Sequence, residues 1–487
     1  MMGGLKPYST YKDSRIPWLG QVPEHWEVIP LKRIAWFKGG TGFPVEEQGQ
    51  RGLDLPFFKV SDMNLPGNEK NMVVWKNTIS RDTANRLGAT IFPTGTIVFP
   101  KIGGAMLTNK RRVVGCPCCI DNNLMGCVVR KGHPGFILLL LQQIDFGTIA
   151  KPGPVPAISE GEVRDIRVAL PPLSEQAAIV RFLDWADRRF QRVIRARQKR
   201  IRLLGEYKKV VIHRAVTGQI DVRTGEPYPA YKDSCIPWLG QVPEHWEVIP
   251  LKRIAWFKGG TGFPVEEQGQ RGLDLPFFKV SDMNLPGNEK NMVVWKNTIS
   301  RDTANRLGAT IFPTGTIVFP KIGGAMLTNK RRVVGCPCCI DNNLMGCVVR
   351  KGHPGFILLL LQQIDFGTIA KPGPVPAISE GEVREIRVAL PPLSEQAAIV
   401  RFLEAETVNI DQVIASTRNE IELLREFRNH LMTDVVTGKL DVREATNNLP
   451  EELQTDEFEE LEPDTLDKYE EDAANELLDV EPVGVEA

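Results

Sequence analysis

Apolar residues recur at helical spacing over a long stretch that begins at Leu170-Pro-Pro-Leu-Ser-Glu-Gln-Ala-Ala-Ile179. Ser174 is a candidate N-cap, and the pattern ends at Thr217-Gly218, where Gly suits the residue just past a helix end. The pattern predicts one helix of roughly 40 residues, on the order of 60 Å long. A helix of this length needs a partner along its apolar stripe. The stripe consists of Ile179, Leu183, Ala186, Phe190, Val193, Ile194, Ile201, Leu204, Tyr207 and Val211.

The chain supplies a candidate partner helix itself. The same start recurs at Leu390-Pro-Pro-Leu-Ser-Glu-Gln-Ala-Ala-Ile399, and the second helical pattern ends at Thr437-Gly438. Each long helical pattern follows a globular segment. The sequence therefore predicts two globular domains, each followed by a long helix, with the two helices paired in a coiled coil.

The globular segments show a different pattern. Apolar runs of strand length alternate with turn residues such as Gly39-Gly-Thr-Gly42 and Gly103-Gly104. Short helices are expected near residues 80–87 and 136–144. The expected strands include 26–29, 55–60, 72–75, 96–99, 127–130 and 166–170. The pattern predicts a mixed α+β domain before each long helix.

The two halves of the chain are one repeat. Residues 16–164 and 236–384 are identical at 149 consecutive positions. Identity continues to Leu183 and Leu403, except for one position, and then the two helices diverge. Helices that pack on each other need different faces, whereas two domains with the same task do not. The divergence therefore favours a repeat with a functional role over a tandem duplication that has no functional consequence.

The formal net charge of zero hides an uneven distribution. Residues 444–487 hold 17 acidic residues and one basic residue, so the rest of the chain carries a net charge of +16. A basic body favours a polyanion such as nucleic acid as partner. We expect the acidic tail to be largely disordered.

The cysteines cluster without the paired spacing of a zinc site. Cys116, Cys118, Cys119 and Cys127 recur in the second repeat, and small buried strand residues are the favoured interpretation over a zinc site. No secretory signal is visible, and the longest apolar run is far too short to span a bilayer. We expect a cytoplasmic protein that binds no metal and no membrane.

Signatures of catalysis are absent from the sequence. It contains no phosphate-binding loop, no His-Glu-x-x-His, no Gly-x-Ser-x-Gly and no Asn-Pro-Pro-Tyr or Asp-Pro-Pro-Tyr tetrapeptide. Gly39-Gly-Thr-Gly42 is too short for a dinucleotide-binding loop. The residues by themselves therefore give no support for an enzyme, and an enzyme with unrecognised motifs stays open.

Basic and polar residues stand beside the turns of each globular segment. Lys and Arg neutralise phosphates, and polar loop residues can read base edges. Each one alone fits a solvated surface charge equally well, but together they favour a DNA-binding surface. The candidate DNA contacts are Lys38, Thr41, Lys59, Ser61, Lys101, Lys110, Arg111 and Arg112, with Lys258, Thr261, Lys279, Ser281, Lys321, Lys330, Arg331 and Arg332 in the second repeat.

Several motifs resemble the specificity subunit of Type I restriction–modification systems. The order of parts, domain–helix–domain–helix, is similar as well, and the resemblance covers residues 8–443. The start of each long helix is the most specific signal. The motifs are Ile16-Pro-Trp-Leu-Gly-x-x-Pro-x-x-Trp26, Phe57-Phe-Lys-Val-Ser-Asp-Met63, Gly95-Thr-Ile-Val98 with Lys101-x-Gly103, and Leu170-Pro-Pro-Leu-x-Glu-Gln-x-x-Ile179.

The resemblance implies two target-recognition domains that read the halves of an interrupted double-stranded DNA site, and a pseudo-two-fold, antiparallel coiled coil. It implies a non-catalytic subunit that docks two methyltransferase subunits, joined by restriction translocase subunits. S-adenosylmethionine, ATP and Mg would belong to those partners. The expected boundaries are 1–172 for the first recognition domain, 173–218 for the first helix, 219–392 for the linker and second recognition domain, 393–438 for the second helix and 439–487 for the tail.

The identity of the two domains departs from the family pattern of two different recognition domains. Identical domains related by a two-fold axis would read identical half-sites on opposite strands, so we expect an interrupted palindrome. Two alternatives stay open. One is a coiled-coil scaffold that binds protein, which would lack salt-sensitive DNA binding. The other is an enzyme with unrecognised motifs, which would transfer methyl groups by itself.

Overall fold

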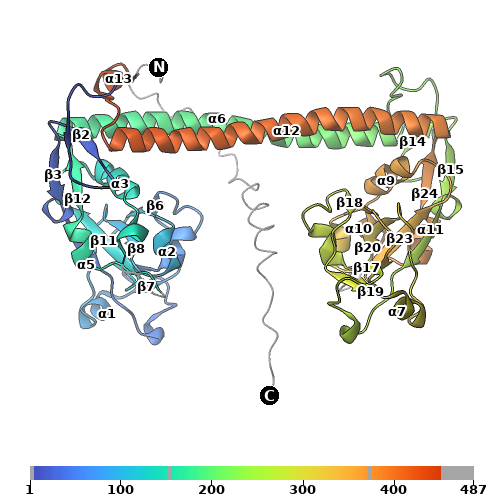
Figure 1. The fold of residues 1–487 in the computed structure, drawn as a ribbon, viewed down its shortest axis with the longest axis horizontal. Coiled ribbons are helices and arrows are strands. Elements are labelled where there is room, and N and C mark those ends of the chain that lie inside the picture. Colours follow the sequence, from blue (N-terminus) through green and yellow to red (C-terminus); the bar gives the residue numbers. More distant parts are fainter. Residues whose placement is uncertain (1–4, 151–154, 371–374, 451–487) are drawn as a thin grey trace. The chain divides into compact units, whose positions relative to one another are not determined.

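The computed structural model describes residues 5–150, 155–370 and 375–450. The chain divides into two compact units, both drawn in Figure 1. Unit 1 combines Met1–Arg192 with Leu424–Ala487, and unit 2 is Val193–Leu423. Each unit contains one copy of the repeat and a part of both long helices.

Unit 1 is built around short strands. They are β1 (Tyr11–Asp13), β2 (Gln21–Pro23), β3 (Glu27–Pro30), β4 (Ala35–Gly39), β5 (Leu55–Phe58), β6 (Asn71–Met72), β7 (Thr78–Ile79), β8 (Ile97–Pro100), β9 (Arg112–Val114), β10 (Cys119–Ile120), β11 (Leu124–Val129) and β12 (Arg167–Leu170). The larger sheet has the order β4-β11-β8-β9-β6, and the smaller has the order β10-β5-β7. Neighbours are antiparallel except β5 with β10 and β6 with β9. Two antiparallel pairs, β1 with β2 and β3 with β12, stand apart.

The central strand β8 is buried on both faces, which explains its continuous apolar sequence. Its side chains alternate across the sheet, so Ile97 and Phe99 enter one apolar core while Val98 enters another. On the neighbouring strand β11, Cys127 joins the first core and Leu124 the second. The sheet is therefore a layer between two cores.

Short helices cover this sheet. They are α1 (Arg81–Arg86), α2 (Gly104–Leu107), α3 (Pro134–Gln143), α4 (Phe146–Ile149) and α5 (Glu160–Asp165). In Figure 1, α3 lies between the sheet and the long helices, and its Phe136 and Leu140 share a core with Ile179 and Phe182 of the first long helix. The helices predicted near 80–87 and 136–144 are confirmed by α1 and α3, and the mixed α+β fold is confirmed.

Unit 2 repeats this arrangement, with strand orders β16-β23-β20-β21-β18 and β19-β17-β22. Its strands are β13 (Tyr231–Asp233), β14 (Gln241–Pro243), β15 (Glu247–Pro250), β16 (Ala255–Gly259), β17 (Leu275–Phe278), β18 (Asn291–Met292), β19 (Asn297–Ile299), β20 (Ile317–Pro320), β21 (Arg332–Val334), β22 (Cys339–Ile340), β23 (Leu344–Val349) and β24 (Arg387–Leu390). Its short helices are α7 (Arg301–Arg306), α8 (Gly324–Leu327), α9 (Pro354–Gln363), α10 (Phe366–Ile369) and α11 (Glu380–Glu385).

The two long helices are α6 (Leu173–Val216) and α12 (Leu393–Val436), each of 44 residues. Their divergent sequences are complementary in charge: α6 holds 12 basic and 4 acidic residues, and α12 holds 4 basic and 8 acidic residues. The described part of the chain contains no helix both long enough and apolar enough to cross a membrane.

Within each unit, α6 and α12 pack against each other in antiparallel directions, because later residues of α6 meet earlier residues of α12. Apolar and ionic contacts both contribute. The pairs are Asp187–Arg428 and Phe190–Phe427 in unit 1, and Arg197–Glu420 and Lys208–Asp411 in unit 2. The predicted pairing of the two long helices is confirmed.

The start of α6 differs from the sequence prediction. The helix begins at Leu173, and the carbonyl of Pro172 accepts hydrogen bonds from the N–H groups of Glu175 and Gln176, both at 3.0 Å. Pro172 therefore supplies the first acceptor, as an N-cap residue does. The prediction of Ser174 as N-cap is wrong, since Ser174 already lies inside the first turn.

Glu175 joins the first turn of α6 to the globular domain that precedes this helix. Its side chain is buried and accepts hydrogen bonds from the Tyr8 hydroxyl at 2.6 Å and from Trp26 Nε1 at 2.9 Å. The Nε2 atom of His25 lies 2.8 Å from its other oxygen. Burial and the hydrogen bond to Glu175 raise the pKa of Tyr8 well above its usual range, so the Tyr8 hydroxyl stays protonated and donates. The Glu175 carboxylate thus connects the first turn of α6 to residues at the start of the domain.

The beginning of the predicted tail is ordered. Residues 443–447 form helix α13 (Arg443–Asn447), Leu449 is buried, and the Thr446 hydroxyl donates to the Ala178 carbonyl at 3.2 Å. The prediction of disorder from residue 439 is therefore wrong for 439–450, because Val442 and Leu449 are buried in the core of unit 1. Residues 451–487 lie outside the described residues.

Candidate nucleic-acid interface

The carboxyl ends of several strands meet at one place in unit 1. Strands β5 and β10 are parallel, so their ends coincide, and the N–H of Asp121 donates to the Phe58 carbonyl at 2.9 Å. The N–H of Thr41, just past β4, donates to the Ile120 carbonyl at 3.0 Å. The end of β4 is thereby joined to the ends of β5 and β10.

Strand β8 adds a fourth end. The N–H of Lys101 donates to the carbonyl of Asn123 at 2.9 Å, in the turn that connects β10 to β11. Lys38 is the penultimate residue of β4, and Lys59 directly follows β5. Four of the predicted DNA contacts, Lys38, Thr41, Lys59 and Lys101, therefore lie at neighbouring strand ends.

A close backbone approach holds this junction together. A Cβ atom on Gly40 would lie 2.2 Å from the carbonyl oxygens of both Ile120 and Asp121. No side chain fits at that distance, so only glycine allows β4 to meet β10 in this way. The Gly39-Gly40-Thr41 turn is therefore shaped by its neighbours as well as by its own sequence.

One carboxylate stands among these basic side chains. Glu160, the first residue of α5, accepts a hydrogen bond from the Gly39 N–H at 2.7 Å, and Lys38 Nζ lies 3.7 Å from the same oxygen. A Cβ atom on Gly39 would lie 2.6 Å from Lys101 Nζ, which places that ammonium directly on the turn. The sequence analysis missed Glu160, since no local motif connects it with residues 121 positions away.

Lys59 and Ser61 belong to a turn that the buried side chain of Asp62 stabilises. The buried Asp62 accepts a hydrogen bond from the Lys59 N–H at 2.8 Å, and burial raises the pKa of Asp62 above its ordinary value. The Lys59 ammonium donates to the Gln48 side chain. Ser61 is exposed. This turn presents one basic and one hydroxyl side chain at the end of β5.

The basic triplet at 110–112 does not form one surface. Lys110 donates through its ammonium to the side chain of Asn64, which ends the same turn as Ser61. Arg112 is half-buried, and burial lowers its pKa. Only Lys110 is thus connected to the turn that carries the other candidates.

Arg111 lies in the interior. Its side chain is 1% exposed, and its guanidinium carbon lies 4.1 Å from the ring centre of Phe146 and 5.3 Å from that of Phe99. It donates to the Ile144 carbonyl at 3.2 Å, and burial lowers its pKa to about 10. A side chain in this position cannot reach a phosphate, so Arg111 and its counterpart Arg331 are removed from the set of DNA contacts.

Unit 2 builds the same junction. Thr261 and Lys321 make the same backbone hydrogen bonds, Glu380 accepts from the Gly259 N–H at 2.7 Å, and Lys258 Nζ lies 3.7 Å from Glu380. The remaining predicted contacts of unit 2 lie as their counterparts do in unit 1. Lys279 and Ser281 belong to the turn after β17. The Lys330 ammonium donates to the side chain of Asn284, and Arg332 is half-buried.

The cysteines act as small apolar side chains. Cys118, Cys119 and Cys127 are buried, and burial raises the pKa of the Cys119 thiol to about 11. Their predicted role as small buried residues is confirmed. Cys116 is half-buried.

The sequence of each unit matches one family model, the Type I restriction modification DNA specificity domain, over residues 23–202 and 243–423. The two matches cover most of the chain and follow the internal repeat. The chain belongs to this family. The resemblance noted in the motifs is thereby confirmed.

Curated relatives in this family are specificity subunits. The putative type I restriction enzyme MjaX specificity subunit of Methanocaldococcus jannaschii is 23% identical over 449 residues, which are 87% of this chain and 96% of the relative. The EcoDI specificity subunit of Escherichia coli is 23% identical over 446 residues, 88% of this chain and 92% of the relative.

Solved structures show the same fold. The HsdS subunit from Thermoanaerobacter tengcongensis matches with a TM-score of 0.51 and 17% identity, covering 86% of this chain and 98% of its own. A chain solved in work on complex assembly and conformational transition of the type I R-M system matches with a TM-score of 0.63 and 17% identity, covering 86% and 99%. These matches extend across both repeats.

Proposed function

We propose that this chain is the subunit that reads the DNA sequence in a Type I restriction–modification complex, and that the strand-end junction of each unit contacts the DNA. The observation that carries this proposal is the gathering of Lys38, Lys59 and Lys101 on neighbouring strand ends around a glycine turn. Lysines supply phosphate contacts, and Thr41, Ser61 and the nearby asparagines supply groups for base edges.

The target we propose is a bipartite, interrupted palindrome. Both units use an identical recognition domain, and α6 and α12 run antiparallel within each unit. Identical readers attached to oppositely directed helices would make the same contacts on opposite strands. The half-sites would then be reverse complements of each other, separated by bases that neither domain reads.

Methyltransferase subunits are the partners we propose for the long helices. Leu203, Tyr207 and Val210 of α6 are 50, 55 and 52% exposed, whereas Ile201 on the packed face is 9% exposed. The three follow one another at intervals of four and three residues, so they share one helix face. An exposed apolar stripe of this kind marks a protein-binding surface. Catalysis, with S-adenosylmethionine, ATP and Mg, would reside in the methyltransferase and restriction subunits.

Selection from a random duplex library tests the DNA part of the proposal. The full chain, co-purified with the methyltransferase subunit of its system, is expected to enrich two separated half-sites and to lose affinity steeply with salt. Binding without sequence enrichment or salt dependence would favour the scaffold alternative.

Co-purification tests the docking part. Replacing Leu203 and Tyr207 with Ser is expected to reduce recovery of the methyltransferase subunit at least tenfold, because the apolar contact is lost. The exposed neighbour Lys209→Ser is the control. Equal recovery from both variants would exclude this stripe as the docking surface.

A further inference from the structure

The strand-end junction contains a negative charge where a DNA-binding surface is expected to be positive. The Glu160 carboxylate lies 2.7 Å from the Gly39 nitrogen and 3.7 Å from Lys38 Nζ, and its side chain is 34% exposed. Asp121 of the same junction is half-buried, and its carboxylate accepts a hydrogen bond from the Asn123 side chain at 2.8 Å. Glu160 is therefore the carboxylate in direct contact with the glycine turn.

The protein fixes Glu160 at this place through its backbone. The Gly103 N–H donates to the Pro156 carbonyl at 2.8 Å, and the Ile158 N–H donates to the Lys101 carbonyl at 2.9 Å. Ser159 then caps α5 in a reciprocal capping box. The segment that carries Glu160 is thus bound to the segment that carries Lys101, so the carboxylate and the ammonium group belong to one rigid arrangement.

Two physical effects follow from this position. The carboxylate occupies the Gly39 N–H, which orients the turn that carries Thr41. It also offsets part of the positive charge of Lys38. Non-specific DNA binding depends on phosphate neutralisation, whereas specific binding adds contacts to base edges. A group that weakens phosphate neutralisation and also orients the side chains that contact base edges raises the ratio of specific to non-specific affinity.

We propose that Glu160, with Glu380 in unit 2, is a positioning residue that sets the sequence discrimination of the recognition domain. This inference rests on the proposed function of the junction in DNA binding. Glu160 holds the glycine turn in the orientation that faces the bases, and its charge limits binding to DNA that lacks the target.

Paired variants separate the two effects. Glu160→Gln with Glu380→Gln removes the charge but keeps an acceptor for the Gly39 N–H, so non-specific affinity is expected to rise about three- to tenfold with a steeper salt dependence. Glu160→Ala with Glu380→Ala also frees the turn, so the ratio of specific to non-specific affinity is expected to fall at least tenfold. Fluorescence anisotropy of the full complex, on target duplex and on duplex of equal length without the motif, measures both.

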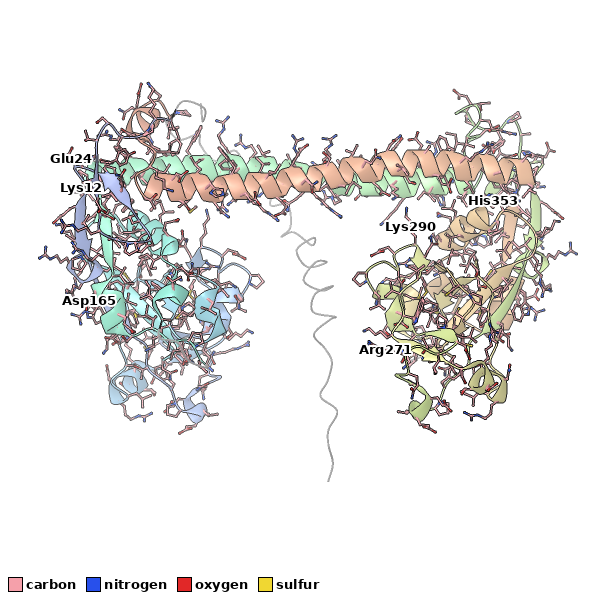
Figure 2. The ribbon with its side chains drawn as sticks, in the orientation of Figure 1. Lys12, Glu24, Asp165, Arg271, Lys290 and His353 are labelled. Atoms are coloured by element: carbon pink, nitrogen blue, oxygen red, sulfur yellow. The ribbon has the colours of Figure 1, made fainter. Side chains whose placement is uncertain are left out.

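The matched control lies at the other end of the same helix. Asp165, labelled in Figure 2, pairs with Lys32 at 2.7 Å, with both side chains exposed in unit 1, and Glu385 pairs with Lys252 at 2.6 Å in unit 2. Asp165→Asn with Glu385→Gln removes the same number of charges away from the junction, and should leave the affinity ratio unchanged. Thermal unfolding verifies that all variants fold.

The outcomes distinguish this inference from the function on which it rests. If wild type discriminates its target but the Glu160 variants match the Asp165 control, the inference is overturned and the DNA-reading function stands. If wild type shows no salt-sensitive DNA binding, the proposed function itself fails.

Discussion

The indole Nε1 of Trp26 donates a hydrogen bond to the Glu175 carboxylate at 2.9 Å, across 149 positions of sequence. Trp26 lies near the start of the recognition domain, and Glu175 lies in the first turn of the long helix that follows it. Unit 2 repeats the contact between Trp246 and Glu395 at 2.8 Å. One buried carboxylate thus connects each domain to its helix, which gives a physical reason for the Glu of the helix-start motif.

Replacing Glu175 and Glu395 with Ala is expected to destabilise the protein. The change leaves the buried donors of Tyr8 and Trp26 without an acceptor, at a cost on the order of 3 kcal/mol per unit. The midpoint of thermal unfolding should fall by roughly 6–12 °C. The control is Glu24→Ala, which changes an exposed side chain (Figure 2). A shift no larger than that of the control would show that the carboxylate is dispensable.

Replacing Lys101 and Lys321 with Ala is expected to weaken DNA binding while the fold persists. Each lost phosphate contact should reduce the magnitude of the salt slope by about 0.9. Titrations of one duplex at several salt concentrations provide the measurement. Lys12→Ala with Lys232→Ala, on the separate β1 and β13 strands, should leave the slope unchanged. Equal slopes for both pairs would place the DNA contact elsewhere.

Replacing Gly40 and Gly260 with Ala is expected to abolish sequence-specific binding. The new Cβ atom would meet two carbonyl oxygens at 2.2 Å, so the ends of β4 and β10 must separate. The affinity for target duplex should fall at least a hundredfold, and thermal stability should decrease. In contrast, Gly104→Ala with Gly324→Ala adds a methyl group in open space. Retained binding by the Gly40 variant would contradict the close approach.

Replacing Arg111 and Arg331 with Ala is expected to affect stability rather than DNA contact. The change removes a buried side chain packed on Phe146 and leaves a cavity, at a cost of about 3 kcal/mol per unit. Urea unfolding and anisotropy on the folded fraction separate the two effects. Lys110→Ala with Lys330→Ala should give the opposite result, with weaker binding and little change in stability. If the folded Arg111 variant bound DNA more weakly while its stability were unchanged, Arg111 would count again as a candidate DNA contact.

The sequence predicted the elements whose signal is local. The long helices follow from apolar residues at helical spacing, and β8 follows from a short apolar run between turns. The repeat itself made the second unit predictable from the first. The short helices α1 and α3 were also expected, near residues 80–87 and 136–144, and α3 follows from its apolar content.

The sequence could not predict contacts between distant segments. Arg111 stands in a basic triplet that indicates a surface, but two phenylalanines from other segments enclose it. Glu160 carries no local signal for its contact with Gly39. Ser174 is of a residue type that is common at the N-cap, but the carbonyl of the preceding Pro172 already supplies the first acceptor of the helix. In each case the tertiary neighbour decides the role of the residue.

Genome-wide mapping of methylated bases by long-read sequencing tests the central claim most directly. The chain is co-expressed with the methyltransferase subunit of its system in a host without other DNA methylation. The account predicts one interrupted motif whose two half-sites are reverse complements of each other. Two unlike half-sites would contradict the argument from identical domains, and the absence of any motif would contradict the DNA-reading function.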